Sequence, residues 1–381
     1  MGLLLLEPPL LHMKNRILLI LICVISLLQG CSKEENSSNY SYTTAELELV
    51  EKVVLGEKEY FNPSSASVTY KSTDSLHSFM SNGGVIRTYD SKGSLIRLFD
   101  KNALENSYEY PGSLPTAFDF TERNLFLFFG GTPTVFVVDE KDSIVDRINL
   151  KLGENHWIQR APYLEVNNNK ELIYISIANI DSELSENNFF SKSSLIGVFN
   201  FEGDLLETFG KFPKEYESSG KFSRGNPFRY YQYLKDKNTH YFLFDIMDEV
   251  YMYNENKKNW DTINIKARVR SYDFEESNIP FFSKQSLNKA TNDVYHFISH
   301  NPSNNKLYIG TQRLLEKHPN KDDFLLIISP KEKSIKEVNL TKYFGIQYHA
   351  LMPSTIASDT LTFFLASPFS DKVHLIKTTL K

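Results

Sequence analysis

One supersecondary unit recurs along most of this chain. Each copy has an aromatic-rich strand, an apolar strand, a tight polar turn and a strand that alternates apolar and polar residues, and it returns at intervals of roughly 50–75 residues. The apolar-strand–turn–strand hairpins are predicted at Val85–Phe99, Val135–Leu150, Leu195–Phe209, Val250–Ile265 and Phe324–Leu340. The aromatic-rich strands before them are predicted at Leu125–Phe129, Leu172–Ile177, Tyr241–Phe244 and Leu307–Ile309, and a last pair at Leu361–Leu365 and Val373–Thr379.

Short antiparallel strands that repeat at this period predict an all-β fold, a six-bladed β-propeller over residues 46–381. Each blade buries its faces only against its neighbours, so the ring has to close. The last unit is one strand short, and we expect the segment Leu47–Leu55 to complete it from the N-terminal side. Seven blades or a two-sheet sandwich are the alternatives, although six similar hairpins fit a sandwich poorly.

Composition agrees with a large folded β-domain. Hydrophobic residues make up 41% of the 381 residues and charged residues 23%, which is too apolar for a disordered chain. The 28 Phe and 21 Tyr favour strands. A net charge of −5 gives no indication of nucleic-acid binding. The two cysteines, Cys23 and Cys31, exclude a disulfide framework and a multi-cysteine metal site.

The first thirty residues have the pattern of a secretion signal. Lys14 and Arg16 precede the apolar run Ile17–Leu28, which is shorter than the roughly 20 residues that span a bilayer but is typical of a signal peptide. We therefore predict that residues 1–30 are a signal peptide and that translation starts at Met13.

The end of this segment resembles the lipobox of bacterial lipoproteins, because the small residue Gly30 precedes Cys31. In that family the chain is cleaved before the cysteine, which is then acylated. An ordinary cleavable signal with an incidental cysteine is the alternative. Ser32–Glu35 contains a lysine followed by two acids, which resembles the surface-export signal of Bacteroidota lipoproteins; a simple polar tether and periplasmic retention are the alternatives. Residues 31–45 are predicted to be the acylated cysteine and a flexible polar tether.

Lipobox, acidic tether and six irregular blades together resemble the six-bladed propeller lipoproteins of Bacteroidota, which include families of unknown function with distant similarity to TolB-like and NHL propellers. The resemblance covers residues 13–381 and rests on architecture, since the sequence has no WD or Kelch signature. It implies an outer-membrane lipoprotein, anchored through its lipid and exposed at the cell surface. It assigns no catalytic residue.

The long insertions are predicted to share one face of the propeller. With the strands of a blade labelled A to D from the axis outwards, the A–B and C–D turns lie on one face, and the B–C loops and the D-to-A crossings between blades lie on the other. The insertions fall at two B–C loops, Asn179–Ser193 and Thr311–Asp323, and at two crossings, Gly210–Tyr230 and Ala267–Asn288. Loops of this length in a compact domain are typical of binding sites.

The crossings on this face combine arginines with aromatic residues. Such side chains would suit an anionic or sugar-like ligand, because arginine donates two hydrogen bonds to a carboxylate or phosphate and aromatic rings stack on sugars. The alternative is that the arginines pair with nearby acids such as Glu215, Glu217 and Glu275. The predicted ligand-binding residues are Trp157, Arg160, Arg224, Arg229, Tyr230, Tyr231 and Arg268.

Two further groups of residues suggest metal sites only weakly. Asp245, Asp248 and Glu249 crowd one B–C loop, where a solvated acidic turn is the more ordinary interpretation. His296 and His300 lie four residues apart in a predicted strand without a visible third ligand. We therefore predict no metal and no cofactor.

The sequence contains no local catalytic motif: it has no nucleophile elbow, no zinc-protease motif and no phosphate-binding loop. Two classes of function remain. The first is a binding module for a peptide, glycan or protein partner; the alternative is a propeller hydrolase or lyase that acts on polysaccharide or peptide, whose catalytic residues would come from separate blades.

Overall fold

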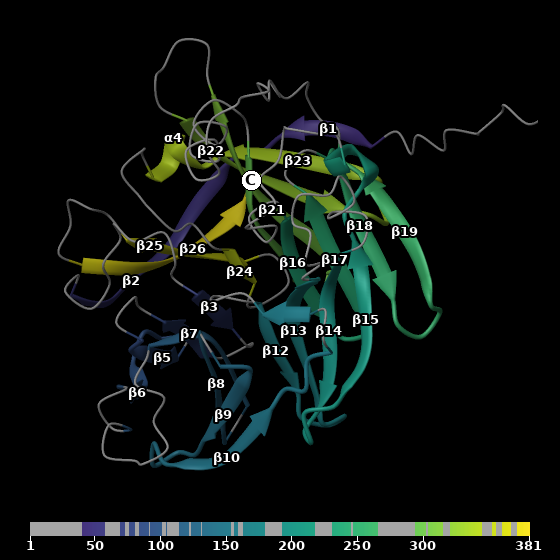
Figure 1. Cartoon of the computed structure of the whole chain (residues 1–381). Helices are drawn as coiled ribbons and strands as arrows, with labels where there is room; N and C mark the ends of the chain where they lie inside the picture. Colours follow the sequence, from purple (N-terminus) through teal and green to yellow (C-terminus); the bar gives the residue numbers. More distant parts are fainter. Residues whose placement is uncertain are drawn as a thin grey trace, which may run out of the picture. The chain divides into compact units, whose positions relative to one another are not determined.

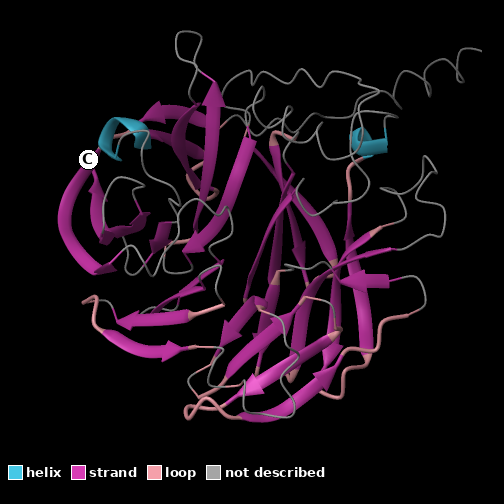
Figure 2. Cartoon of the chain, turned by 60° about the vertical axis from the view of Figure 1, so that its left-hand side comes forward, coloured by secondary structure: helices cyan, strands magenta, loops and turns pink. Residues whose placement is uncertain are grey.

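The described part of the chain forms a ring of six small antiparallel sheets, as predicted (Figure 1). This computed structural model describes residues 40–381 with gaps, of which the longer ones are 58–68, 105–113, 180–192, 218–230, 266–293 and 345–352. The signal peptide and most of the tether lie outside the described residues. Strands dominate the described chain (Figure 2). None of its helices has the length and hydrophobicity that crossing a membrane requires.

Five blades take their four main strands in chain order, and the sixth takes its outermost strand from the N-terminal part of the chain. Blade one contains β3 (Thr69–Ser72), β4 (Leu76–Met80), β5 (Ile86–Asp90) and β6 (Leu95–Phe99), and blade two contains β7 (Pro115–Phe120), β8 (Leu125–Phe129), β9 (Thr134–Val138) and β10 (Ile144–Asn149). Blade three contains β12 (Leu164–Asn167), β13 (Leu172–Asn179), β14 (Ser194–Asn200) and β15 (Leu205–Lys211), with β11 (His156–Ile158) on the far end of β13. Blade four contains β16 (Tyr231–Asp236), β17 (Thr239–Phe244), β18 (Glu249–Asn254) and β19 (Asn259–Asn264). Blade five contains β20 (Val294–Asn301), β21 (Lys306–Leu314), β22 (Lys321–Ser329) and β23 (Ser334–Asn339), and blade six contains β24 (Pro353–Thr355), β25 (Thr360–Ala366), β26 (Lys372–Leu380) and β2 (Leu47–Glu57).

The predicted closure of the ring is confirmed. Strand β2 pairs antiparallel with β26, from Leu47 opposite Leu380 to Glu57 opposite Lys372. The N-terminal part of the propeller therefore lies beside its C-terminus (Figure 1). Because a blade with three strands would leave β26 as an open edge, this pairing completes both blade six and the ring.

One boundary differs from the sequence prediction. Ser41–Thr44, expected in the flexible tether, form strand β1, which pairs parallel with β23 at the outer edge of blade five. The Ser41 N–H donates to the Lys333 carbonyl at 2.9 Å, and the Ala45 N–H donates to the Glu337 carbonyl at 2.8 Å. The polar, Thr-rich sequence suits an exposed edge strand, and the folded unit begins at Tyr40 rather than at residue 46.

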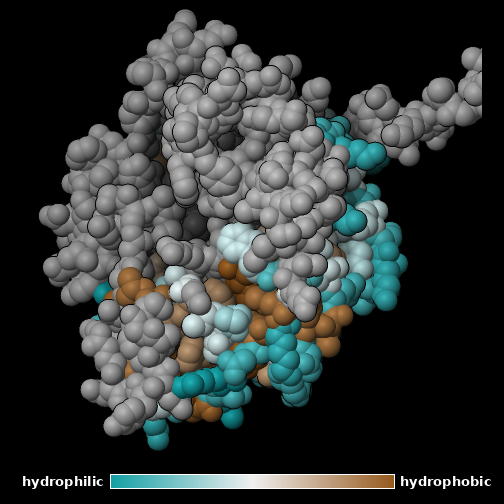
Figure 3. All heavy atoms as spheres, in the orientation of Figure 1, coloured by the Kyte–Doolittle hydropathy of each residue, from teal (hydrophilic) through white to brown (hydrophobic). Residues whose placement is uncertain are grey.

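The core lies between neighbouring blades. The middle strands are buried on both faces; β8, for example, is buried along its whole length from Leu125 to Phe129. Phe126 and Val137 of blade two pack with Ile173 and Ile175 of blade three. The outermost strands are more exposed; in β10 only Ile148 is buried. Over blades three and four, hydrophilic residues gather at the outer margin and hydrophobic ones lie inward of them (Figure 3).

The two faces differ in the lengths of their connections. Because each blade is antiparallel, its A–B and C–D turns share one face, and its B–C loops and the crossings to the next blade share the other. The turns are short; 121–124, 139–143, 237–238 and 255–258 are examples. The crossings are long and comprise 58–68, 100–114, 150–163, 212–230, 265–293 and 340–352. The crossing 212–230 includes the 3-10 helix η3 (Lys214–Glu217), and the crossing 340–352 includes the helix α4 (Leu340–Phe344).

One of the four predicted insertions is wrong. Thr311–Asp323 is mostly strand, because β21 and β22 continue as a ladder in which Gln312 faces Asp323 and Leu314 faces Lys321. The B–C loop of blade five is therefore only 315–320. The B–C loop of blade three remains long at 180–193, and the other two insertions are crossings between blades, as expected.

Candidate functional site

The innermost strands of blades one to four carry charged side chains. Lys71 is on β3, Asp119 on β7, Glu165 on β12 and Lys235 on β16, so four successive blades each contribute one. We call these residues, together with the side chains that they contact, the inner cluster. The side chains of Lys71, Asp119 and Lys235 are largely buried, so their charged groups need partners.

Lys71 connects three blades. Its Nζ donates to the Leu164 carbonyl of blade three at 2.7 Å and lies 3.9 Å from the Asp119 carboxylate of blade two. It also lies 4.5 Å above the ring of Tyr163, a cation–π contact. Asp119 Oδ2 in turn accepts a hydrogen bond from the Val166 N–H at 2.6 Å. The pair is largely buried, with Asp119 12% exposed in its side chain.

Tyrosines extend the inner cluster from blade three to blade four. The Tyr163 hydroxyl donates to the Glu165 carboxylate, and its ring meets that of Tyr233 edge-on with centroids 4.4 Å apart. Burial raises the pKa of both hydroxyls well above the usual value, so both stay protonated and act as donors. Burial also raises the pKa of the Asp119 and Glu165 carboxyls, whereas the positive charge of Lys71 acts in the opposite direction and partly offsets this rise.

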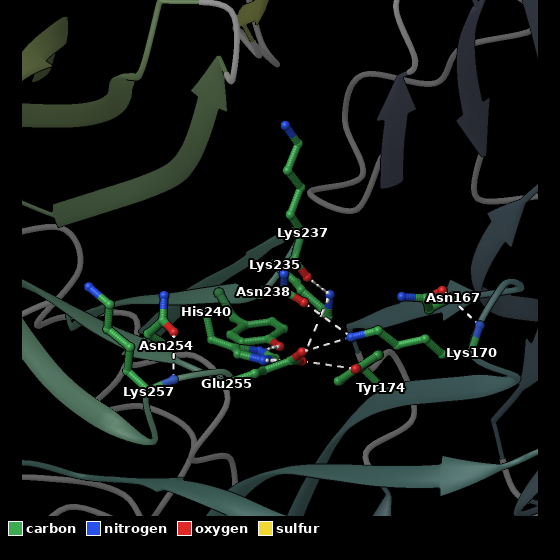
Figure 4. A network of polar contacts seen from close by, with 11 residues as sticks. Asn167, Lys170, Tyr174, Lys235, Lys237, Asn238, His240, Asn254, Glu255 and Lys257 are labelled. Carbon is green, nitrogen blue, oxygen red and sulfur yellow. Dashed lines mark hydrogen bonds and ion pairs between the residues drawn. The ribbon is translucent and has the colours of Figure 1, made fainter.

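Glu255 is the hub of the other half of the cluster (Figure 4). Its Oε1 accepts hydrogen bonds from His240 Nε2 at 2.8 Å and from the Tyr174 hydroxyl at 2.9 Å. Lys170 Nζ donates to Oε2 at 3.3 Å, and Lys235 Nζ lies 4.0 Å from Oε1. Burial alone would raise the pKa of Glu255, but the His240 hydrogen bond and the Lys235 charge outweigh it and lower that pKa to about 2. Glu255 is therefore ionised throughout the physiological range.

The buried His240 has a defined tautomer. Burial lowers its pKa, so the imidazole is neutral near pH 7 and carries one proton. Nε2 faces the Glu255 carboxylate and must hold that proton, which leaves Nδ1 to accept from the Tyr233 hydroxyl at 2.6 Å. The Tyr233–His240–Glu255 chain thus has its donors and acceptors matched in one direction. Since its members lie on β16, on β17 and in the turn after β18, this chain of hydrogen bonds holds three strands of blade four together.

We expect Glu255→Gln to lower the free energy of unfolding by about 1–3 kcal/mol at pH 7, because Lys170 and Lys235 lose their shared anion. A carboxyl whose pKa falls from its ordinary 4.5 to about 2 on folding stabilises the protein fully above pH 4.5 and progressively less as pH falls towards 2. The difference in the free energy of unfolding between wild type and variant, measured from urea unfolding curves, should therefore become smaller below pH 4.5. Glu202→Gln, in an exposed turn, is the control. A gap independent of pH would contradict this account.

Most of the predicted ligand-binding residues lie outside the described part of the chain: Arg160, Arg224, Arg229, Tyr230 and Arg268. The structure places Trp157 half-buried on β11, opposite Ala178. Tyr231 begins β16, is only 5% exposed and packs with Phe212 and Phe244. Its hydroxyl donates to the Leu195 carbonyl at 3.3 Å. The structure therefore assigns Tyr231 to the core between blades three and four.

The structure gives no support for a metal site at either of the two groups that the sequence suggested weakly. Asp245 lies outside the described residues, and the Asp248 carbonyl accepts from the Ile265 N–H at 2.8 Å. The register of β20 to β21 shifts between Tyr295 and Phe297, and the side chain of His296 lies outside the described residues. His300 pairs with Asp236 at 2.7 Å and Asn305 at 3.1 Å. Within the described residues no group of three His, Cys, Asp or Glu side chains is placed to hold a metal ion.

The inner cluster could not be predicted because the innermost strands had not been located; β3, β12 and β24, for example, have only three or four residues each. One usable signal exists: Asp119 is a charged residue between two phenylalanines, Phe118 and Phe120.

Solved structures share this fold at low sequence identity. A member of the DUF4221 family from Bacteroides vulgatus has a TM-score of 0.60 and 12% identity, over 91% of this chain and 99% of that one. A protein from Bacteroides fragilis that is described as exported has a TM-score of 0.50 and 9% identity, over 90% of this chain and 100% of that one. No protein-family model matches the sequence, and no curated protein is significantly similar to it. The predicted resemblance to propellers of Bacteroidota is thus confirmed at the level of fold.

Proposed function

We propose that the protein is an exported binding module, held at the outer membrane by an acyl chain on Cys31, whose propeller binds a ligand on the face of the long connections. The observation that carries this proposal is the difference between the two faces. All the crossings and the longest B–C loop emerge on one side of the ring, whereas the A–B and C–D connections on the other side are short. In rigid scaffolds, recognition is concentrated where long connections gather.

The inner cluster supports a binding role over a catalytic one. The carboxylates Asp119, Glu165 and Glu255 are bonded to lysine, tyrosine, histidine or backbone partners. A general acid or base needs instead a proton that a substrate can reach. The scaffold is thus stiffened at its centre, while the long connections are left to vary. The alternative of a propeller hydrolase or lyase would require catalytic residues supplied by those connections.

The ligand that we favour is an anionic peptide or glycan, because Arg160, Arg224, Arg229 and Arg268 lie in the crossings into blades three, four and five. An array of sulfated, carboxylated and neutral glycans and of acidic peptides tests this choice. We expect binding to anionic members and a loss of about tenfold or more in affinity for Arg224→Ala combined with Arg229→Ala, since charge-assisted hydrogen bonds contribute about 1.5–3 kcal/mol each.

The matched control is Arg123→Ala, an exposed arginine in the A–B turn 121–124 on the opposite face. Equal losses for both sets of variants, or binding unaffected by either, would show that the crossings do not hold the ligand.

The proposal places the protein at the cell surface, because Lys33, Glu34 and Glu35 lie next to Cys31. Protease treatment of intact cells should remove the protein, and protection would place it in the periplasm.

A further inference from the structure

A largely buried lysine–aspartate pair lies next to a second carboxyl group where blades one, two and three meet. Lys71 on β3 and Asp119 on β7 form an ion pair whose side chains are only 18% and 12% exposed. Glu165 on β12 lies within electrostatic reach of both. Burial raises the pKa of its carboxyl most, the positive charge of Lys71 lowers that pKa and the negative charge of Asp119 raises it. An amine and two carboxyl groups are therefore gathered at one place.

The Lys71 amine is held beside the Asp119 carboxyl by contacts to other groups. Its Nζ lies 3.9 Å from Asp119 Oδ1, which is longer than the about 2.7–2.9 Å of a charged hydrogen bond. The Nζ donates instead to the Leu164 carbonyl at 2.7 Å and lies 4.5 Å from the centre of the Tyr163 ring. The carboxyl is fixed separately, because its Oδ2 accepts from the Val166 N–H at 2.6 Å. The pair thus lies close together without the tight contact that would stabilise two ions.

The surroundings favour the uncharged forms of this pair. Burial raises the pKa of the Asp119 carboxyl, and the positive charge of Lys71 offsets that rise only in part. Moving a proton from the ammonium to the carboxylate removes two charges from a poorly solvated site, which a low dielectric favours where the ions are not in close contact. The result is a neutral amine next to a neutral carboxylic acid, and these are the two groups that condense to an amide.

We propose that Lys71 and Asp119 condense to an isopeptide bond, which joins blade one covalently to blade two. The lone pair of Nζ attacks Asp119 Cγ, and the Val166 N–H stabilises the negative charge that develops on Oδ2. Glu165 accepts a proton from the attacking nitrogen and delivers a proton to the departing hydroxyl. One C–N bond forms, one C–O bond breaks and one water molecule leaves, so the step is a condensation that needs no further reactant.

A second lysine–carboxylate pair of the inner cluster lacks the features that this reaction needs. Lys235 lies 4.0 Å from Glu255, and its side chain is only 2% exposed. The Glu255 carboxyl nevertheless stays ionised, because the hydrogen bond from His240 and the Lys235 charge outweigh burial and hold its pKa at about 2. A carboxylate anion resists attack by an amine. We therefore expect no bond between Lys235 and Glu255.

The isopeptide bond would serve the purpose of a disulfide in a chain that cannot form one, since residues 40–381 contain no cysteine. It would close the loop 71–119, which contains β4, β5 and β6 of blade one. A covalent link of this kind stabilises a protein mainly by constraining its unfolded chain. The innermost strands of two neighbouring blades would then stay joined even when the rest of the propeller unfolds.

Peptide mapping of the full chain, purified from the cells that express it and unfolded in urea, tests the bond. Trypsin does not cleave after a lysine whose amine is acylated. The linked chain should therefore yield the peptide Glu59–Arg87 joined to Asn102–Arg123, with the sum of their masses less one water molecule. We expect this linked pair in most wild-type molecules. Lys71→Arg keeps the positive charge but lacks the amine, and it should abolish the linked pair completely.

Glu165→Gln should lower the linked fraction about tenfold or more, because general acid–base catalysis contributes roughly 10²–10⁴-fold to a rate. Glu255→Gln is the matched control, since it removes another acid of the inner cluster and should leave the link intact. Wild-type protein that unfolds cooperatively in urea, yet is cleaved after Lys71 and gives no linked peptides, would overturn the proposal and leave a simple ion pair. A link from Lys71 to the peptide Ala161–Lys170 would overturn it in favour of Glu165 as the acceptor. Equal linkage in Glu165→Gln and wild type would contradict the proton transfer by Glu165.

Discussion

A chain that begins at Lys58 should fail to fold cooperatively, whereas a chain that begins at Ala45 should fold nearly as well as the whole propeller. The first lacks β1 and β2, and the second lacks β1 only. Both are produced without a signal peptide, next to a chain that begins at Ser32, and are compared by urea unfolding and size-exclusion chromatography.

The expected difference follows from what each strand buries. β2 buries Leu47 and Leu55, each contributing about 1.5–3 kcal/mol, and forms the ladder to β26 that closes the ring. This loss is comparable to the whole stability of a domain, about 5–15 kcal/mol. β1 has only four residues, mostly exposed, and its removal should cost on the order of 1–2 kcal/mol. A cooperative transition in the chain from Lys58 would show that the ring is stable while open.

The sequence was sufficient to predict most middle and outer strands of the blades, although β4 of blade one was not among them. Runs such as Leu125–Phe129 and hairpins such as Leu195–Phe209 carry their pattern locally, in the alternation of apolar residues and in the polar turn. The closure by Leu47–Leu55 was predictable because a count of strands left one blade incomplete. Strand β1 was not, since four polar residues gain a strand conformation only from the edge of β23.

The inner cluster depends on contacts between distant parts of the sequence, and this explains why residue patterns did not reveal it. Lys71 bonds to the carbonyl of Leu164, and Lys170 bonds to Glu255. Leu164 belongs to a different blade from Lys71, and Glu255 to a different blade from Lys170, so each pair meets only when the ring of blades has formed. In the sequence, each of these charges looks like a solvated residue next to a turn. The arginines of the crossings are easier to recognise in the sequence, but whether they bind a ligand depends on the conformation of the crossings.

Gly203→Ala should be among the most destabilising single substitutions in the described chain. Gly203 lies in the turn between β14 and β15 with φ +82°, a conformation that strains other residues by about 1–3 kcal/mol. A Cβ there would also overlap the carbonyl oxygen of Asn149, at the end of β10 in the neighbouring blade, and lie 2.7 Å from its carbon. Strain and overlap together should lower the free energy of unfolding by more than about 3 kcal/mol.

Blades two and three are joined next to Gly203 by a backbone hydrogen bond and by an ion pair, and substitutions can distinguish their contributions. The Lys151 N–H donates to the Gly203 carbonyl at 2.8 Å, and the Lys151 ammonium pairs with Asp204 at 2.7 Å. Because that ion pair is exposed, Lys151→Ala should cost at most about 1 kcal/mol while the backbone bond persists. Gly153→Ala, at a glycine without positive φ and with no contact closer than 3.4 Å, should change stability by less than about 0.5 kcal/mol. Thermal unfolding of the three variants measures the order; if Lys151→Ala proves as damaging as Gly203→Ala, then charge rather than close backbone packing joins blades two and three.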